Sequence, residues 1–190
     1  MPEAGSVRDG GWQTRIGANL RGKCLGVMGL GNIGKEVARI ALAFGMTVIA
    51  WSQNLTSEIA SAAGATLVDK DALFRQADIV TIHLILSRRT SGLIGAAELA
   101  LMKPTAWLIN TSRGRIVDQG ALIEALRARK IAGAALDVFD DEPLPADHPF
   151  RRLDNVLATP HIGYVTEELY RTFYGDAAAS IAAWLESNAA

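Results

Sequence analysis

Three side chains in the second half of the chain are of the types needed to move a proton on a small organic acid. Arg113 carries a planar guanidinium that can hold a carboxylate. His161 can exchange a proton near neutral pH. Glu142 can bond to one ring nitrogen of that histidine, orient the ring and favour its protonated form. Together they predict a site that binds a 2-oxo acid, polarises its carbonyl and protonates the alkoxide as a hydride arrives.

Each of these residues also has a structural interpretation. Arg113 could pair with Asp137 or cap a helix. Glu142 could be a turn residue before a proline, and His161 could be a hydrogen-bonded loop histidine after one. We interpret His148, in Pro-Ala-Asp-His-Pro, as a surface-loop residue. The catalytic interpretation therefore depends on whether the fold brings the three side chains together.

Short apolar runs alternate with helical patterns along most of the chain. The runs are Cys24–Met28, Thr47–Trp51, Thr66–Val68, Ile79–His83, Ala106–Asn110, Gly133–Leu136 and Val156–Ala158. Most are continuous rather than alternating, as in strands covered on both faces. Strands that alternate with helices predict an α/β fold with a doubly wound parallel sheet, Rossmann-like, in three αβα layers.

Three helical patterns have recognisable faces or caps. The pattern over 33–44 places these residues on one face: Ile33, Val37, Ile40, Ala41 and Phe44. The pattern over 121–129 carries Leu122, Ala125 and Leu126, with Asp118 as its cap. The last, over 166–186, starts with a threonine cap and two glutamates, which suit the positive end of a helix dipole.

The polar candidates all follow predicted strands. His83 ends the fourth apolar run, although it could equally be a buried strand-end residue. Arg113 follows the fifth run, Asp137 and Glu142 follow the sixth, and His161 follows the seventh. Ligands of open parallel sheets bind beyond the carboxyl ends of the strands. The pattern therefore predicts that one cation, the acids and a histidine meet at one edge.

A glycine loop follows the first apolar run. In GLGNIG, Gly29 permits a tight turn, Gly31 lets the backbone approach a pyrophosphate, and Gly34 lets the helix pack closely on the sheet. The N–H groups of Asn32 and Ile33 would point at the phosphates from a helix N-terminus. A strand–helix turn without a ligand is the alternative. The order strand, glycines, helix favours a dinucleotide.

The residue expected to hold the ribose is not acidic. Dinucleotide folds usually place a carboxylate about 20 residues beyond the glycine loop. Here Ser52 follows the second apolar run, with Gln53 and Asn54 after it. A carboxylate repels a 2′-phosphate and a serine does not, but no arginine follows directly to grip one. The choice between NAD and NADP stays open on these residues.

Composition narrows the class of protein. The chain has 190 residues with a net charge of −1, which gives no electrostatic footprint for nucleic acid. Cys24 is the only cysteine, which fits a reducing compartment. No signal peptide, membrane span or metal site is predicted, so we expect a soluble, cytoplasmic protein. We divide it into an irregular connector over 1–20, a dinucleotide-binding domain over 21–165 and a C-terminal helix over 166–190.

Four stretches together resemble a known family. They are GLGNIG at 29–34, MKPTAWLINTSRGRIVD at 102–118, AALDVFDDEPLP at 134–145 and TPHIG at 159–163. They closely resemble the nucleotide-binding domain of the D-isomer-specific 2-hydroxyacid dehydrogenases, which include phosphoglycerate dehydrogenase and glyoxylate/hydroxypyruvate reductase. The resemblance covers residues 12–184. It implies hydride transfer between a nicotinamide cofactor, NAD or possibly NADP, and a small D-2-hydroxy or 2-oxo acid.

The resemblance also implies residue roles. Arg113 would bind the substrate carboxylate, Glu142 and His161 would handle the proton, and Asp137 would contact the nicotinamide carboxamide. The cofactor would lie along Gly29, Gly31, Asn32, Ile33, Gly34, Ser52, His83, Leu84, Thr90, Thr111, Ser112, Arg113, Asp137, His161 and Gly163. Members are usually dimeric through this domain, which implies a homodimer.

The chain departs from the family pattern in three places. Ile85 replaces a proline that family members often carry after the fourth strand, and Ser52 replaces the usual aspartate. The family's substrate-binding domain is not in this sequence, and the helix over 166–190 would return toward it. Since that domain supplies substrate contacts and excludes water on closing, we expect little turnover from this chain alone.

Two other functions stay open. One is a non-catalytic dinucleotide-binding or dimerisation module, which the retained Arg113, Glu142 and His161 argue against without excluding. The other is oxidation of an inorganic or one-carbon acid. Glu142 disfavours it, because formate enzymes of the family tend to carry glutamine there.

Overall fold

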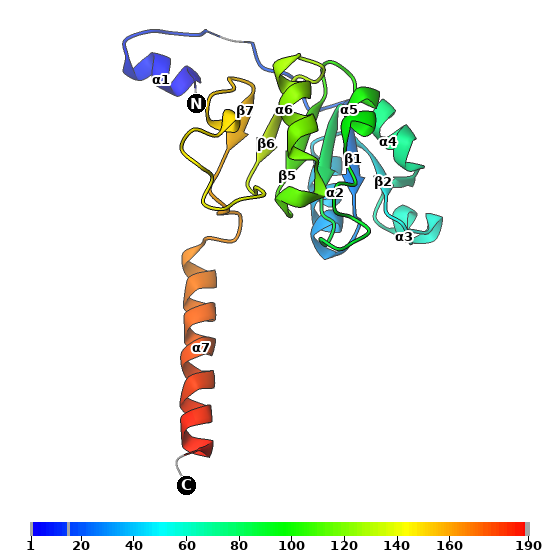
Figure 1. Cartoon of the computed structure of the whole chain (residues 1–190). Helices are drawn as coiled ribbons and strands as arrows, with labels where there is room; N and C mark the ends of the chain where they lie inside the picture. Colours follow the sequence, from blue (N-terminus) through cyan, green and yellow to red (C-terminus); the bar gives the residue numbers. More distant parts are fainter. Residues whose placement is uncertain (1, 15, 189–190) are drawn as a thin grey trace.

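The computed structural model describes residues 2–14 and 16–188, and a sheet of seven parallel strands forms its centre (Figure 1). The strand order is β3-β2-β1-β4-β5-β6-β7, and every pairing is parallel. The strands are β1 (Cys24–Met28), β2 (Thr47–Trp51), β3 (Thr66–Leu67), β4 (Ile79–Ile82), β5 (Trp107–Asn110), β6 (Gly133–Leu136) and β7 (Val156–Ala158). The predicted fold class is confirmed, and no predicted strand end is off by more than one residue.

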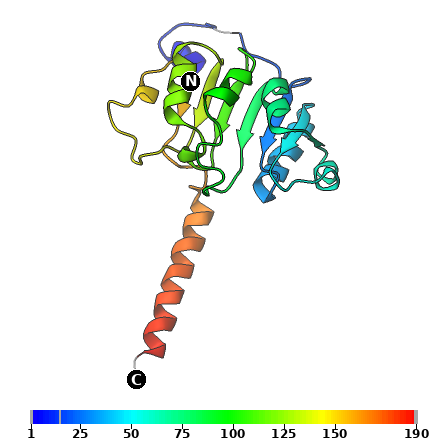
Figure 2. The ribbon, with the colours of Figure 1, turned by 45° about the vertical axis from the view of Figure 1, so that its right-hand side comes forward.

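Helices cover the two faces of the sheet unequally (Figure 2). One hydrophobic core joins α4, α5 and α6 to the sheet, and a second joins α2 and α3 to β1 and β2. The helices inside the sheet domain are α2 (Asn32–Ala43), α3 (Ser57–Ala62), α4 (Lys70–Gln76), α5 (Ala96–Leu101) and α6 (Gln119–Arg127), with short 3₁₀ turns η1 (Gly114–Ile116) and η2 (Pro149–Arg151). The cap predicted for α6 is confirmed, because the Asp118 carboxylate accepts the Ala121 N–H at 2.9 Å.

The face predicted for the helix after the glycine loop was partly wrong: Ala41 is buried and Val37 packs half-buried against the second core as predicted, but the three largest residues of that face are exposed. The buried residues of α2 are Gly34, Ala38 and Ala41, whereas Ile33, Ile40 and Phe44 are exposed. Close packing explains the difference, since a Cβ at Gly34 would collide with the backbone oxygen of Gly29. Small residues therefore face the sheet, and the large apolar ones point away from it.

On the second face of the sheet, none of the described helices covers β5, β6 and β7. Across the paired strands, Trp107 is aligned with Leu25 and Leu157 is aligned with Val27, so each pair points to the same face of the sheet. Leu25 and Val27 belong to the core that α2 and α3 cover, so Trp107 and Leu157 lie on that face too. Leu157 is 63% exposed and Trp107 is 40% exposed. Parallel sheets are normally covered on both faces, so this surface lacks a covering layer within the described part of the chain.

The first and the last described helix both lie outside the layers of the sheet domain (Figure 1). The lead-in over 1–20 was predicted to be irregular, but α1 (Pro2–Arg8) is helical. The C-terminal helix α7 (Glu167–Ser187) begins at its predicted threonine cap, where the Thr166 hydroxyl accepts the Leu169 N–H, and none of its residues is buried. Positions 1, 15, 189 and 190 of these two ranges lie outside the described residues. None of the described helices combines the length and apolarity needed to cross a bilayer.

Candidate functional site

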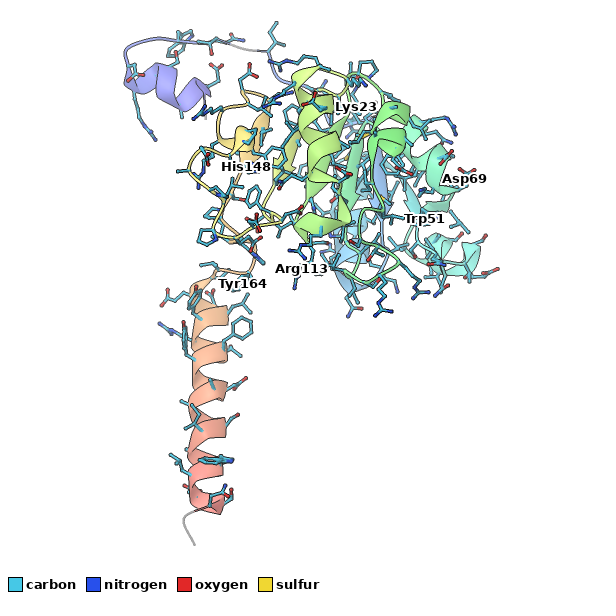
Figure 3. The ribbon with its side chains drawn as sticks, in the orientation of Figure 1. Lys23, Trp51, Asp69, Arg113, His148 and Tyr164 are labelled. Carbon is cyan, nitrogen blue, oxygen red and sulfur yellow. The ribbon has the colours of Figure 1, made fainter. Side chains whose placement is uncertain are left out.

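The residues singled out by type gather at one edge of the sheet. Figure 3 shows Arg113 and Tyr164 at the edge from which α7 leaves, and Lys23, just before β1, at the opposite edge. The chain runs outward from β1 to β3 and then returns to β4 on the other side of β1. A crevice forms beyond the strand ends at such a reversal, and open parallel sheets bind ligands there.

The glycine loop is shaped by backbone contacts at two of its positions. Gly29 has a φ of +96°, and a Cβ there would lie 2.5 Å from the backbone oxygen of His83. Gly34 packs against the backbone oxygen of Gly29, as described above. Gly31 is different, because nothing lies within 4 Å of the position its Cβ would take. That open space is where a pyrophosphate could approach the backbone without meeting a side chain.

The start of α2 faces a cavity that suits a cofactor. Asn32 and Ile33 are the first residues of α2, so their N–H groups have no intrahelical acceptor and can bind phosphate. The cavity measures about 520 Å³ and is lined by Ile33, His83, Leu84, Ile85, Leu86, Thr111, Ser112 and Arg113. The structure therefore joins six of the predicted cofactor residues in one space. Ile85, which replaces the family proline, also lines it and is 86% exposed.

Ser52 lies directly after β2, beside the glycine loop. The Gly29 N–H donates to the backbone oxygen of Trp51 at 2.9 Å, which ties the end of β2 to the loop. Ser52 is half-buried, and its two successors are the uncharged Gln53 and Asn54. The position predicted to hold the ribose is therefore flanked by hydrogen-bonding groups without a charge.

His83 and Thr90 bracket the loop after β4. His83 Nε2 lies 3.0 Å from the Thr81 hydroxyl, and burial lowers the pKa of His83, so the ring is neutral at pH 7. The Thr90 hydroxyl donates to the Ile85 oxygen at 2.6 Å and accepts the Ser87 N–H at 2.8 Å. The Thr90 hydroxyl therefore stabilises the loop after β4 through these internal hydrogen bonds. Its contact with a cofactor stays a prediction.

The turn that carries Arg113 is braced by a buried amide. Asn110, at the end of β5, is 1% exposed; its Oδ1 accepts the Ser112 N–H at 3.0 Å and its Nδ2 donates to the Arg113 oxygen at 2.9 Å. The Ser112 hydroxyl donates to the Ile82 oxygen at 2.7 Å. The Arg113 guanidinium donates to the Ser112 oxygen at 2.6 Å and forms no ion pair with Asp137. Its charged face remains open to a ligand.

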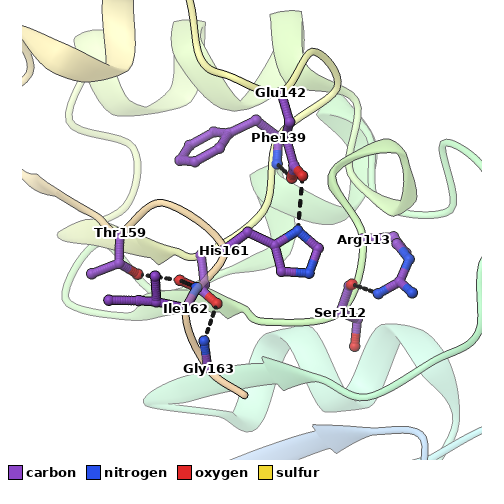
Figure 4. A network of polar contacts seen from close by, with 9 residues as sticks. Ser112, Arg113, Phe139, Glu142, Thr159, His161, Ile162 and Gly163 are labelled. Atoms are coloured by element: carbon purple, nitrogen blue, oxygen red, sulfur yellow. Dashed lines mark hydrogen bonds and ion pairs between the residues drawn. The ribbon is translucent and has the colours of Figure 1, made fainter. Parts of the chain in front are cut away.

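Glu142 and His161 form the predicted acid–histidine pair (Figure 4). Glu142 Oε2 lies 2.8 Å from His161 Nδ1, and Oε1 accepts the Phe139 N–H at 2.9 Å. Burial opposes ionisation of Glu142, but the bonds from His161 and Phe139, helped by the charge of Arg113, outweigh it and lower its pKa. An ionised carboxylate only accepts, so Nδ1 carries the proton and Nε2 is left for a ligand.

Asp137 holds the loop that carries His161. Its Oδ1 accepts the Thr159 hydroxyl at 2.5 Å and the Ile162 N–H at 3.0 Å, and its Oδ2 accepts the Gly163 N–H at 2.9 Å. Burial opposes ionisation of Asp137 too, but these bonds outweigh it and lower its pKa. The loop places His161 at a φ of +55°, a conformation that needs such support. The nicotinamide contact expected of Asp137 stays a prediction.

A second cavity is lined by both members of the pair. It measures about 540 Å³ and is lined by Phe139, Glu142, Pro143, Leu144, Arg151, Ala158, Thr159, Pro160 and His161. The side chains of Glu142 and His161 are 36% and 35% exposed. The pair therefore lines an open space and remains accessible to water.

Several residues of the site were missed from the sequence. Asn110 and Thr159 are polar residues at the carboxyl ends of strands, and that position could have identified them as candidate site residues from the sequence. Phe139 acts through its backbone N–H, which no residue type reveals. Tyr164 packs edge-on against the His161 ring at 5.8 Å. His148 also has a structural role, because its Nδ1 accepts the Phe150 N–H at 3.2 Å.

Comparison with known proteins agrees with this geometry. The profile of a family described as D-isomer specific 2-hydroxyacid dehydrogenase, NAD binding domain, matches residues 2–163. A glyoxylate reductase of Aeropyrum pernix is 49% identical over 160 residues, which are 83% of this chain and 48% of the relative. A D-3-phosphoglycerate dehydrogenase of Synechocystis is 46% identical over 88% of this chain and 31% of the relative. The chain thus spans half the length of these curated relatives or less.

Solved structures show the same likeness. A putative D-3-phosphoglycerate dehydrogenase oxidoreductase from Ralstonia solanacearum superposes with a TM-score of 0.91 at 38% identity, over 99% of this chain and 59% of the other. An NAD complex of a D-isomer specific 2-hydroxyacid dehydrogenase from Lactobacillus delbrueckii gives a TM-score of 0.76 at 34% identity, over 86% of this chain and 54% of the other.

The brace at Asp137 predicts a pH-dependent stability. Asp137→Asn should lower the free energy of unfolding by about 1–3 kcal/mol at pH 7, because an amide nitrogen cannot accept these bonds. The folded-state pKa is lowered, so the carboxylate stabilises the fold above about pH 4 and this contribution is lost as pH falls through the lowered pKa. Urea unfolding at several pH values measures this, with the exposed Asp147→Asn as control. A difference that persists unchanged at pH 2 would contradict it.

Proposed function

Because this chain belongs to the D-isomer-specific 2-hydroxyacid dehydrogenase family through that family's NAD-binding domain, we propose that it holds NAD at the glycine loop and presents a proton-transfer site to a small 2-hydroxy or 2-oxo acid. The observation that carries the proposal is the Glu142–His161 pair, in which Glu142 Oε2 lies 2.8 Å from His161 Nδ1. Arg113 is close enough that its positive charge helps to lower the pKa of Glu142. A lone histidine would bind a ligand equally well, but only an oriented one delivers a proton to a defined point.

The described residues fit the cofactor. The space before Gly31 admits a pyrophosphate, and the N-terminus of α2 supplies N–H donors and a favourable dipole for it. Beyond the loop, the 520 Å³ cavity is lined mainly by apolar or neutral side chains up to Arg113. When bound, the cofactor would exchange a hydride with the substrate carbon.

The side chains then divide the remaining work. Arg113 would pair with the substrate carboxylate through its planar guanidinium and so fix the position of the reacting carbon. His161 Nε2 would give a proton to the carbonyl oxygen in reduction, or take the hydroxyl proton in oxidation. Glu142, ionised at neutral pH, would hold Nδ1–H and stabilise the charged ring. One proton and one hydride thus move between defined atoms.

By itself the chain should bind cofactor but turn over slowly. The acid–histidine pair is about one-third exposed and lines an open cavity of about 540 Å³, so bulk water reaches the proton-transfer site. Efficient hydride transfer needs such a site to be closed off. With NADH and glyoxylate as probes, we expect a rate far below that of an intact family member. A comparable rate would contradict this part of the proposal.

A second copy of the chain is the expected partner. The face of the sheet over β5, β6 and β7 exposes Leu157 and Trp107, and the outer side of α2 exposes Ile40 and Phe44. Apolar surface of this kind favours self-association. We therefore propose a homodimer, which a molar-mass measurement in solution tests directly. A strictly monomeric chain at micromolar concentration would refute it.

We also propose a cytoplasmic location. Cys24 is the only cysteine of the chain and is half-buried, so the chain has no internal disulfide to preserve. Proteins of oxidising compartments use disulfides far more often than those of the cytoplasm. Imaging of a tagged full-length gene product would decide it.

The glycine loop offers a clean test of cofactor binding. Gly31→Val should weaken NADH binding at least about tenfold, because the new side chain enters the pyrophosphate space. The same change should leave the melting temperature nearly unaltered, since no atom lies within 4 Å of that Cβ position. Nicotinamide fluorescence and thermal unfolding give the two readouts. Gly17→Val, in the lead-in and equally free of neighbours, is the matched control. Undiminished NADH binding by Gly31→Val would count against the proposed site.

Ser52 predicts which cofactors are accepted. We expect the wild-type chain to bind NADH and to tolerate NADPH, because no carboxylate follows β2. Ser52→Asp should weaken NADPH binding about tenfold or more and keep NADH binding, since a carboxylate accepts the ribose hydroxyls and repels a 2′-phosphate. Ser52→Asn, similar in size but uncharged, is the control. An equal loss of NADPH binding in both variants would argue against the charge explanation.

A further inference from the structure

The turn that carries Arg113 and the turn that carries Glu142 touch backbone to backbone at Gly114. A Cβ placed on Gly114 would lie 2.6 Å from the Asp140 nitrogen and would collide with the carbonyl group of Phe139. Those neighbours are main-chain atoms, so they cannot rotate out of the way as a side chain would. Only glycine allows these two turns to approach so closely.

Each turn is also fixed on its far side. Asn110 holds the first turn through the Ser112 N–H and the Arg113 oxygen. The second turn is anchored by Phe139, which is 8% exposed and packs against Phe150 with ring centroids 6.2 Å apart. Neither turn is therefore free to move away from the contact at Gly114.

The contact leads directly to the acid–histidine pair. The Phe139 N–H donates to Glu142 Oε1 at 2.9 Å, and the other oxygen of that carboxylate bonds to His161 Nδ1 at 2.8 Å. A displacement of the Phe139–Asp140 peptide is thus passed first to the Glu142 carboxylate and then to the imidazole. The one flexible side chain in this series of contacts is that of Glu142, and both of its oxygens are held by hydrogen bonds.

We propose that Gly114 is a positioning residue, which fixes the Arg113 guanidinium relative to the Glu142–His161 pair by letting their two turns pack main chain against main chain. The inference rests on the proposed function, because the distance between Arg113 and the Glu142–His161 pair matters for catalysis only if Arg113 holds the substrate on which His161 acts. The contact itself is independent of that function. A cofactor measurement and a measurement on the histidine ring therefore separate the two.

Gly114→Ala tests the inference, with Gly120→Ala as the matched control. Gly120 is an α6 residue whose added Cβ would meet only Asp118 Oδ1, at 3.4 Å. The readout is the NMR signal of the His161 Nδ1 proton, assigned by its loss in His161→Gln and detectable because the bond to Glu142 slows its exchange with water. In Gly114→Ala this signal should broaden or disappear while NADH binding persists. In Gly120→Ala both should match the wild type.

The other outcomes are equally decisive. A wild-type Nδ1 signal in folded Gly114→Ala would overturn the inference, because the pair would then tolerate a shifted turn. If Gly114→Ala fails to fold, the close approach of the two turns can still be tested in the wild-type chain. The measurement is the nuclear Overhauser effect between the Gly114 α-protons and the Asp140 amide proton. A strong effect supports the close approach, and its absence refutes it. A wild-type chain that fails to bind NADH would defeat the proposed function while leaving these ring and amide measurements intact.

Discussion

Backbone hydrogen bonds that continue past the ends of the parallel strands hold the functional loops in place. The His83 N–H donates to Met28, the Asp137 N–H to Asn110 and the Thr159 N–H to Leu136, each just beyond a strand. Parallel pairing aligns all carboxyl ends at one edge, so these bonds line up the loops in the order of the strands. Loops from distant parts of the sequence therefore lie side by side at this edge although each loop is short.

Carboxylates then position the candidate catalytic histidine. Asp137 uses both oxygens to hold the loop around His161, and Glu142 uses one oxygen for its own turn and the other for the histidine ring. Both have a lowered pKa because several donors surround each charge. The same interactions that stabilise the fold thus keep Glu142 ionised at neutral pH, where it can accept the Nδ1–H of His161.

The site is well formed at its base and open above. The glycine loop, the Asn110-braced turn and the acid–histidine pair are fixed by backbone contacts, whereas Arg113 and His161 face solvent-accessible cavities. Such an arrangement suits a domain that binds a cofactor on one wall of a cleft. It also supports the proposal that this chain binds a cofactor without rapid turnover.

The sequence by itself determined the sheet, the glycine loop and the candidate residues for proton transfer, because these depend on local signals. Continuous apolar runs, glycines at fixed spacing and a cap such as Asp118 act over a few neighbouring residues. Tertiary structure decided the buried face of α2. Gly34 and Ala38 are buried there and the larger Ile40 is exposed, because the short distance between helix and sheet admits only small side chains. It also decided the bracing roles of Asn110, Asp137 and Phe139. Their partners lie in other loops, and only the assembled sheet edge brings those atoms within hydrogen-bonding distance.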